Sequence, residues 1–153
     1  MLKFREATIA DLNQMLIWRG QSQASQEAIT REFDSLETGK TTIFLAFEAQ
    51  QLIGTVQLSF DHTDPEMIRD AVYLQAIEVH SAFRQQGIAT ALCQLLETKA
   101  AQKGYSRITV EIEPDNLPSI RFFQKYDYLE FKQSEFTWDG EILPVICFEK
   151  YLK

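Results

Sequence analysis

The chain is organised around the stretch Val79-His80-Ser81-Ala82-Phe83-Arg84-Gln85-Gln86-Gly87-Ile88-Ala89-Thr90-Ala91-Leu92. The apolar run that leads into it, within residues 67–79, predicts a buried central strand. Residues 88–96 carry apolar side chains at helical spacing, and Lys103-Gly104 supplies the basic last turn and the glycine that end such a helix. Residues 107–112 predict the next strand. A strand, a helix and a strand in this order form a right-handed unit, so the two strands should lie parallel in one sheet.

The predicted helix start has the chemistry of an anion-binding site. Gly87 and Ala89 have almost no side chain, so the backbone N–H groups of the first turn can approach a ligand closely. These groups carry the positive end of the helix dipole. A dinucleotide-binding turn would need three spaced glycines and an acidic residue about 20 positions further on, and only Gly87 is present. The phosphate loop of NTPases is excluded because no Gly-Lys-Ser/Thr follows.

The motif Arg84-x-x-Gly87-x-Ala89 resembles the pyrophosphate-binding signature of GNAT-type N-acetyltransferases: Arg or Gln, two residues, Gly, one residue, then Gly or Ala. The flanking sequence is similar to the family in order, with a strand ending at Val79, a helix ending at Gly104, a strand over 108–112, Asn116, and an aromatic helix over 121–125. Residues 4–12 also resemble the family's usual opening. The resemblance implies an α/β fold in one domain, 1–153, with a mixed, mostly antiparallel sheet of six to seven strands, about four helices and a splayed parallel strand pair.

The resemblance also implies acetyl-CoA as cosubstrate and no metal. In the family the pantetheine arm lies between the splayed strands and pairs with strand backbone, while amides at the helix start hold the pyrophosphate. Asn116 would steady the arm, although the residues alone indicate an Asx-turn between two prolines equally well. The residues that the resemblance assigns to the cofactor are Ile77, Val79, Arg84, Gln85, Gln86, Gly87, Ile88, Ala89, Thr90, Asn116, Ser119 and Phe123.

The implied reaction is direct attack of a primary amine on the acetyl thioester. An unperturbed alkylamine has a pKa of about 10.4, so it must lose a proton before it attacks. Glu78, a carboxylate in an otherwise apolar run, is the candidate base, and the Val79 amide is the candidate oxyanion donor. Strand alternation places Glu78 with Val72, Leu74 and Ala76 on one face, and Tyr73, Gln75, Ile77 and Val79 on the other.

The chain departs from the family pattern in the aromatic helix, where the family commonly has a Tyr that protonates the leaving thiolate. Phe123 stands at that position, and Tyr126, one turn on, is the candidate replacement acid, with core packing as its alternative role. The departure leaves two functions open. The chain is expected either to acetylate a small amine or a protein or peptide amine, or to bind CoA as a sensor or partner module without efficient turnover.

Composition limits the remaining possibilities. The chain has 153 residues, 45% of them hydrophobic, and a formal net charge of −7, which argues against nucleic-acid binding and mildly favours a cationic acceptor. The charged start, 1–6, predicts no signal peptide, and no apolar run approaches a membrane span of about 18 residues, so we expect a cytoplasmic protein. A monomer and a homodimer remain open. Cys93 and Cys147 fit neither a disulfide framework nor a zinc site; they are expected to be inert, Cys93 with partial exposure.

The rest of the chain predicts helices and hairpins around this centre. Thr8 and Asp11 resemble a capping box that starts a helix to residue 19, and a polar break over 20–25 precedes a second helix over 26–39. In the resembling family this segment walls the acceptor pocket, so Trp18 and Phe33 either touch substrate or pack in the core. Strand pairs are predicted over 42–60 and, around Asp139-Gly140, over 129–152; Ser119 is predicted to cap a short helix, and the loop containing His62 to be surface.

Overall fold

The computed structural model describes residues 1–60 and 71–152. The loop predicted around His62 and residues 67–70 of the predicted central strand lie outside the described residues. The described elements are the strands β1 (Leu2–Glu6), β2 (Thr41–Glu48), β3 (Gln51–Ser59), β4 (Ala71–Val79), β5 (Arg107–Ile112), β6 (Leu129–Trp138) and β7 (Glu141–Tyr151), and the helices α1 (Leu12–Arg19), α2 (Gln23–Asp34), α3 (Ile88–Gln102) and α4 (Leu117–Lys125). Short 3₁₀ turns precede α1 (Ile9–Asp11) and follow β4 (Ser81–Phe83).

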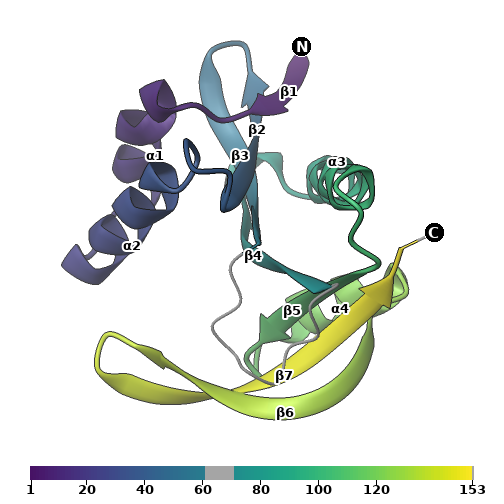
Figure 1. Cartoon of the computed structure of the whole chain (residues 1–153). Coiled ribbons are helices and arrows are strands. Elements are labelled where there is room, and N and C mark those ends of the chain that lie inside the picture. Colours follow the sequence, from purple (N-terminus) through teal and green to yellow (C-terminus); the bar gives the residue numbers. More distant parts are fainter. Residues whose placement is uncertain (61–70, 153) are drawn as a thin grey trace.

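The described strands form a seven-stranded sheet in the order β1-β2-β3-β4-β5-β7-β6 (Figure 1). Within this sheet β4 and β5 pair in parallel and the other neighbours pair antiparallel. Helix α3 makes the crossover between the two parallel strands, because a parallel pair needs a long connection. The predicted strand-helix-strand unit and the mixed, mostly antiparallel sheet are therefore confirmed.

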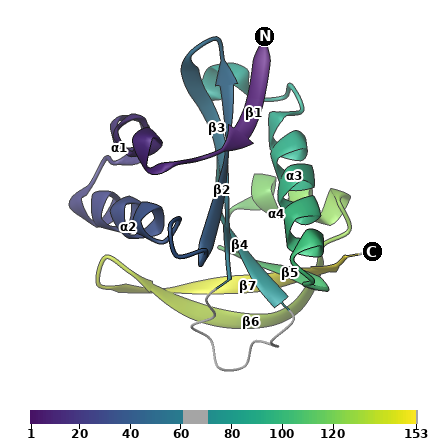
Figure 2. The same ribbon diagram turned by 45° about the horizontal axis from the view of Figure 1, so that its top comes forward.

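Helices cover both faces of the sheet, with α1 and α2 on one side and α3 and α4 on the other (Figure 2). The larger core lies under α3 and α4 and includes Leu92, Leu96 and Phe123. The smaller core lies under α1 and α2, and Phe33, which is 1% exposed, is one of its central residues. Trp18 packs against this smaller core, so packing is the role that the structure shows for both aromatic residues.

Gly54 lets helix α3 pack closely against β3, because it has no side chain. A Cβ atom at Gly54 would lie 3.1 Å from Ile88 Cγ2 and 3.2 Å from Leu92 Cδ1. Interiors packed at crystal-like density have no room for such an addition without a shift of neighbouring groups. Gly54 therefore sets the distance between the sheet and the first two turns of α3.

Two helix starts differ from the sequence prediction. Helix α2 begins at Gln23 rather than near residue 26, because the Ser22 hydroxyl accepts a hydrogen bond from the Ser25 N–H (3.1 Å) and caps it. It also ends earlier, at Asp34. Helix α4 is capped by Asn116 and not by Ser119, whose N–H donates to Asn116 Oδ1 (3.4 Å). The predicted capping box is confirmed, since Asp11 Oδ2 accepts from the Thr8 N–H (2.9 Å).

A bulge interrupts β4 and overturns the predicted alternation. Gln75 pairs with Gln57 and Glu78 pairs with Thr55, so two residues of β4 lie opposite a single residue of β3. Ala76, at this point, has a φ of 52°, in the left-handed region. One extra residue reverses which face each later side chain occupies.

The bulge brings two predicted cofactor residues onto the larger core. Ile77 and Val79 pack against the same apolar cluster that contains Val72 and Leu74, whereas alternation had separated the two pairs. Glu78 correspondingly changes to the opposite face. The predicted strict alternation of side chains between the two faces of β4 is therefore wrong, because the sequence pattern does not show the inserted residue.

The parallel strands separate after a short paired segment. Their register runs from Ala71–Arg107 to Leu74–Val110 and stops there. Beyond this point β4 stays with β3 as far as Val79, and β5 stays with β7 as far as Ile112. The predicted splayed pair is therefore confirmed, and it opens at the bulge.

Candidate functional site

A cavity of about 300 Å³ fills the gap between the separated strands. Its lining comes from β4, β5, the α4 segment and the β6–β7 hairpin, and consists of Leu74, Gln75, Ala76, Ile77, Val110, Glu111, Ile112, Glu113, Asn116, Ser119, Phe123, Phe136 and Val145. We call this space the strand-gap cavity. It brings together four of the predicted cofactor residues, Ile77, Asn116, Ser119 and Phe123.

Val79 presents backbone groups on the open side of β4. His80 N–H donates to Ile53 O on β3 (2.7 Å), and antiparallel backbone groups alternate in direction, so the Val79 N–H and C=O point away from β3. Arg84 Nε donates to the Val79 carbonyl oxygen (3.0 Å). The Val79 N–H is thus directed toward the side where β5 has separated.

The start of α3 is an open, bare turn. Gly87 caps the helix with a φ of 76°, and a Cβ atom there would meet nothing within 4 Å. Gln85, two residues earlier, also has a positive φ, 65°. Ala91 N–H makes a helical bond to Gly87 O (3.0 Å), so the N–H groups of residues 88–90 precede the helical ladder and have no partner within it. The open turn and these N–H groups are the features on which the prediction of an anion cradle rests.

Arg84 and Glu78 form an ion pair beside this turn. Arg84 Nη2 lies 3.2 Å from Glu78 Oε1, and both side chains are exposed. The Arg84 side chain therefore turns back toward β4. Glu78 lies outside the described lining of the strand-gap cavity.

Tyr126 also approaches the start of α3. Its hydroxyl is 2.8 Å from Thr90 Oγ1, and its ring packs against Phe122 with centroids 5.0 Å apart. Phe123, in contrast, is 1% exposed and lines the strand-gap cavity. The Tyr126 phenol thus lies at the helix start, while the ring of Phe123 occupies the strand gap.

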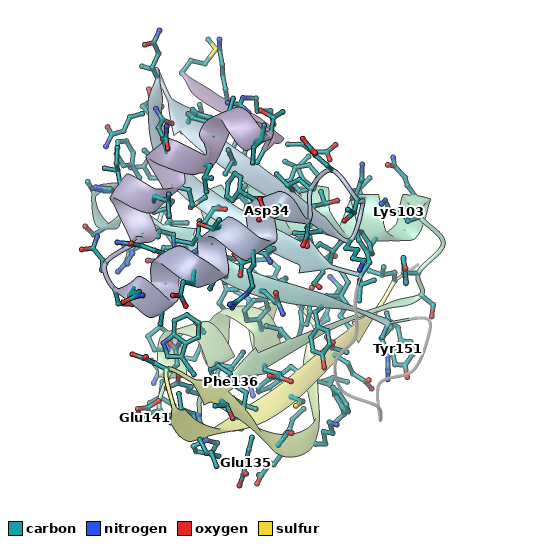
Figure 3. All side chains as sticks on the ribbon, turned by 60° about the vertical axis from the view of Figure 1, so that its left-hand side comes forward. Asp34, Lys103, Glu135, Phe136, Glu141 and Tyr151 are labelled. Carbon is teal, nitrogen blue, oxygen red and sulfur yellow. The ribbon has the colours of Figure 1, made fainter. Side chains whose placement is uncertain are left out.

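A second cavity, of about 550 Å³, opens on the α2 side of the same strands. Its walls come from α1, α2, β4, the end of β5 and β6, and consist of Arg19, Ser25, Ala28, Ile29, Glu32, Tyr73, Leu74, Gln75, Ala76, Glu111, Glu113, Asn116, Phe136 and Trp138. We call it the α2-side cavity. The two cavities share Gln75 and Ala76 and therefore adjoin at the bulge. In Figure 3, Phe136 marks the hairpin that lies beneath α2.

Glu32 is a wall residue that sequence reasoning missed. Burial raises the pKa of its carboxyl, and Arg19, a hydrogen bond from Gln57, and Arg31 oppose that shift. Gln57 Nε2 also donates to Gln75 Oε1 (3.2 Å), so an amide links the neighbourhood of Glu32 to the bulge. The available signal was a carboxylate one turn after Ile29, on the apolar stripe of α2.

The cysteines are both buried, and the partial exposure that the position of Cys93 off the apolar stripe allowed is not found, since Cys93 is 6% exposed. Burial raises the pKa of the Cys93 thiol to about 12, and the nearby Glu97 carboxylate adds to this rise.

Among residues 1–60 and 71–152, no group of three or more His, Cys, Asp or Glu is arranged to hold a metal ion. No helix in the described part of the chain is long and apolar enough to cross a membrane.

One comparison identifies a family by sequence, and another finds solved structures with a similar fold. The sequence profile of the acetyltransferase (GNAT) family matches residues 9–128. An N-acetyltransferase from Staphylococcus aureus Mu50 has a similar structure, with a TM-score of 0.80, 22% identity, and 100% of this chain and 99% of that one covered. A ribosomal-protein-alanine N-acetyltransferase from Brucella melitensis has a TM-score of 0.78 and 21% identity, with 98% of this chain and 99% of that one covered. Arabidopsis thaliana NAA60 in complex with acetyl-CoA has a TM-score of 0.79 and 15% identity, with 99% of this chain and 98% of that one covered. No curated protein sequence matches the chain.

Proposed function

Because the chain belongs to the GNAT acetyltransferase family, we propose that it transfers an acetyl group from acetyl-CoA to a primary amine by direct attack on the thioester. The observation that carries this proposal is the separation of β4 and β5 beyond the Leu74–Val110 pair. That separation opens the strand-gap cavity, which adjoins the α2-side cavity at Gln75 and Ala76. A thioester in the first cavity would meet an amine in the second.

The cofactor would bind in two parts. The diphosphate would lie against the N–H groups from Gln85 to Thr90, where the helix dipole and Arg84 supply local positive potential against a net charge of −7. The pantetheine arm would extend into the strand gap, along the backbone of Ile77 and Val79, with Asn116 and Ser119 beside it. Asn116 Oδ1 already caps α4, so its amide nitrogen is the group that we assign to the arm.

The chemistry proceeds through a tetrahedral intermediate. The amine nitrogen attacks the thioester carbonyl, and the Val79 N–H would donate to the oxygen as it becomes an oxyanion. The C–S bond then breaks and the thiolate leaves. A thiol with an ordinary pKa of about 8.5 leaves readily near neutrality, so Phe123 does not prevent the reaction. Glu78 remains the sequence-based candidate for the base, and its ion pair with Arg84 puts it next to the cofactor turn.

One observation favours the second candidate function, a CoA-binding module with little turnover. Phe123 lines the strand-gap cavity with a ring that can neither donate nor accept a proton. Positioned acid catalysis contributes typically ~10²–10⁴-fold. Loss of that acid would slow turnover while leaving the cofactor contacts in place.

Two measurements test the proposal and separate the two functions. Calorimetric titration with CoA tests binding, and thiol release from acetyl-CoA across a panel of primary amines tests turnover. Saturable binding with turnover supports the transferase; binding without turnover for any amine supports the module. Absence of CoA binding would contradict both.

A charge variant tests the helix-start cradle. Ala89→Glu adds a carboxylate at the first turn of α3 and should weaken CoA binding by about tenfold or more, because like charges repel at this short range. Gln94→Glu, which adds the same charge on the exposed side of the same helix, is the matched control and should leave CoA binding unchanged. Equal affinity of the two variants would contradict the assigned cradle.

A further inference from the structure

We propose that Glu32 binds the ammonium group of the acceptor amine and removes its proton. This inference rests on the proposed transferase function and names the chemistry of its acceptor: a primary alkylamine that arrives as a cation. It goes beyond the sequence-based prediction, which placed the base on β4 at Glu78. The geometry points to α2 instead.

The position of Glu32 in α2 directs it into the α2-side cavity. Ala28 and Ile29, one turn earlier, are buried at 9% and 5% exposure and line the same cavity, so this side of the helix faces the sheet. Glu32 follows on that side and is itself partly buried. Its carboxylate therefore belongs to the cavity wall.

A short chain of amides links Glu32 to the place where the two cavities meet. Gln57 hydrogen-bonds Glu32 and donates to Gln75 Oε1 at 3.2 Å. Gln75 and its neighbour Ala76 line both cavities. An amine held between Glu32 and Gln75 would thus stand at the opening to the thioester, directly or through one water molecule.

The charges around Glu32 favour a cation. The cavity is lined by three carboxylates, from Glu32, Glu111 and Glu113, and by one guanidinium, from Arg19. Arg31, on Glu32's own helix, also acts on Glu32. Aromatic wall residues, Tyr73 on β4 and Phe136 and Trp138 on β6, complete the space and suit the alkyl part of the acceptor, with cation–π attraction for its charge.

Burial of the Glu32 carboxyl suits it to proton transfer. Burial raises its pKa from the ordinary value of 4.5, and a base is most effective when its pKa lies closer to the working pH. Glu78 differs from Glu32 in its contacts: its side chain is 39% exposed, ion-paired with Arg84, and outside the described lining of both cavities. The comparison favours Glu32.

Proton transfer to Glu32 precedes attack on the thioester. The acceptor's ammonium N–H bond breaks, and its proton passes to a Glu32 carboxylate oxygen, which leaves the nitrogen lone pair free to form the new C–N bond. After attack, the nitrogen loses a second proton as the C–S bond breaks, and the thiolate becomes the CoA thiol. Glu32 returns its proton to solvent before the next turnover.

The test compares Glu32→Gln with Asp34→Asn, both in full-length protein. Asp34 lies at the exposed end of the same helix (Figure 3), so Asp34→Asn removes the same charge away from the cavity. With an alkylamine acceptor, Glu32→Gln should lower kcat/KM about 10²-fold, while Asp34→Asn stays near the wild type. With an arylamine, which is uncharged at neutral pH and needs no proton removed before attack, the Glu32→Gln loss should be less than tenfold.

The pH profile gives a second readout, which a structural role would not change. Wild-type kcat/KM for the alkylamine should rise through the raised Glu32 pKa and level near neutrality, whereas Glu32→Gln should keep rising toward the amine's own pKa of about 10.4. Glu32→Asp should restore part of the rate. Equal loss with both amine classes, or an unchanged profile, would overturn the inference and leave the transferase proposal standing; lack of turnover in the wild type would overturn the transferase proposal.

Discussion

Phe123 is the residue at which the chain departs most clearly from the family pattern it otherwise follows. Its ring lines the strand-gap cavity and packs edge-on against Tyr128, with centroids 5.0 Å apart. A hydroxyl added to this ring would be the shortest route to the missing proton donor. The role of the residue can therefore be tested by adding a group.

Phe123→Tyr should raise kcat for acetyl transfer by about tenfold or more, since a positioned acid contributes typically ~10²–10⁴-fold. Steady-state thiol release measures the effect. Phe122→Tyr, on the neighbouring ring outside the described cavity lining, is the control and should not raise kcat. An unchanged or lower rate in a folded Phe123→Tyr variant would show that the ring edge does not face the sulfur.

At the residue scale, the bare turn at the start of α3 could be predicted, but the surroundings of Glu32 could not. Gly87 is informative because it adopts a φ of 76°, which few other residues accept, and because its missing side chain leaves backbone amides accessible. Glu32 carries no comparable signal, since a single carboxylate on a helix is usually solvent-exposed. Its surroundings come from β3, β4 and the β6–β7 hairpin, which the sequence does not place beside α2.

At the element scale, the strands and the crossover helix could be predicted because apolar periodicity and turn residues mark them directly. The bulge in β4 could not, because Ala76 takes a left-handed φ of 52° although alanine gives no sign of one. The start of α2 was missed for a related reason. Several serines and glutamines precede this helix, and composition does not reveal that Ser22 is the one that caps it.

The left-handed conformation of Ala76 in the bulge predicts how substitutions there change the free energy of unfolding. Ala76→Val should lower the free energy of unfolding by about 1–2 kcal/mol, because a β-branched side chain strongly disfavours a positive φ. Ala76→Gly should be neutral or stabilising, since glycine accepts this conformation. Urea denaturation of both variants measures the difference. If valine were tolerated as well as glycine, β4 would not contain a left-handed residue at this position.

At the scale of the whole molecule, the net charge of −7 should speed the association of a cationic acceptor with the protein. Salt shortens the range of exposed charges from about 30 Å at 0.01 M to about 8 Å at 0.15 M. We therefore expect kcat/KM for a cationic alkylamine to fall several-fold over this range, because steering by the protein field weakens. An uncharged arylamine should show no such fall, and equal salt effects on both acceptors would contradict long-range steering.

Gly54 has a consequence for the whole of the proposed cofactor site. The glycine lets Ile88 pack directly on β3, and β3 pairs with β4, so one missing methyl group sets the spacing between the start of α3 and the strand gap. In the proposed binding mode, the diphosphate and the thioester of acetyl-CoA are joined by one flexible chain of limited reach, so a change in that spacing would alter the contacts at both ends. Gly54→Ala would thus shift Ile88 and Leu92 by a few tenths of an ångström, and through them a binding surface that residue 54 does not itself form.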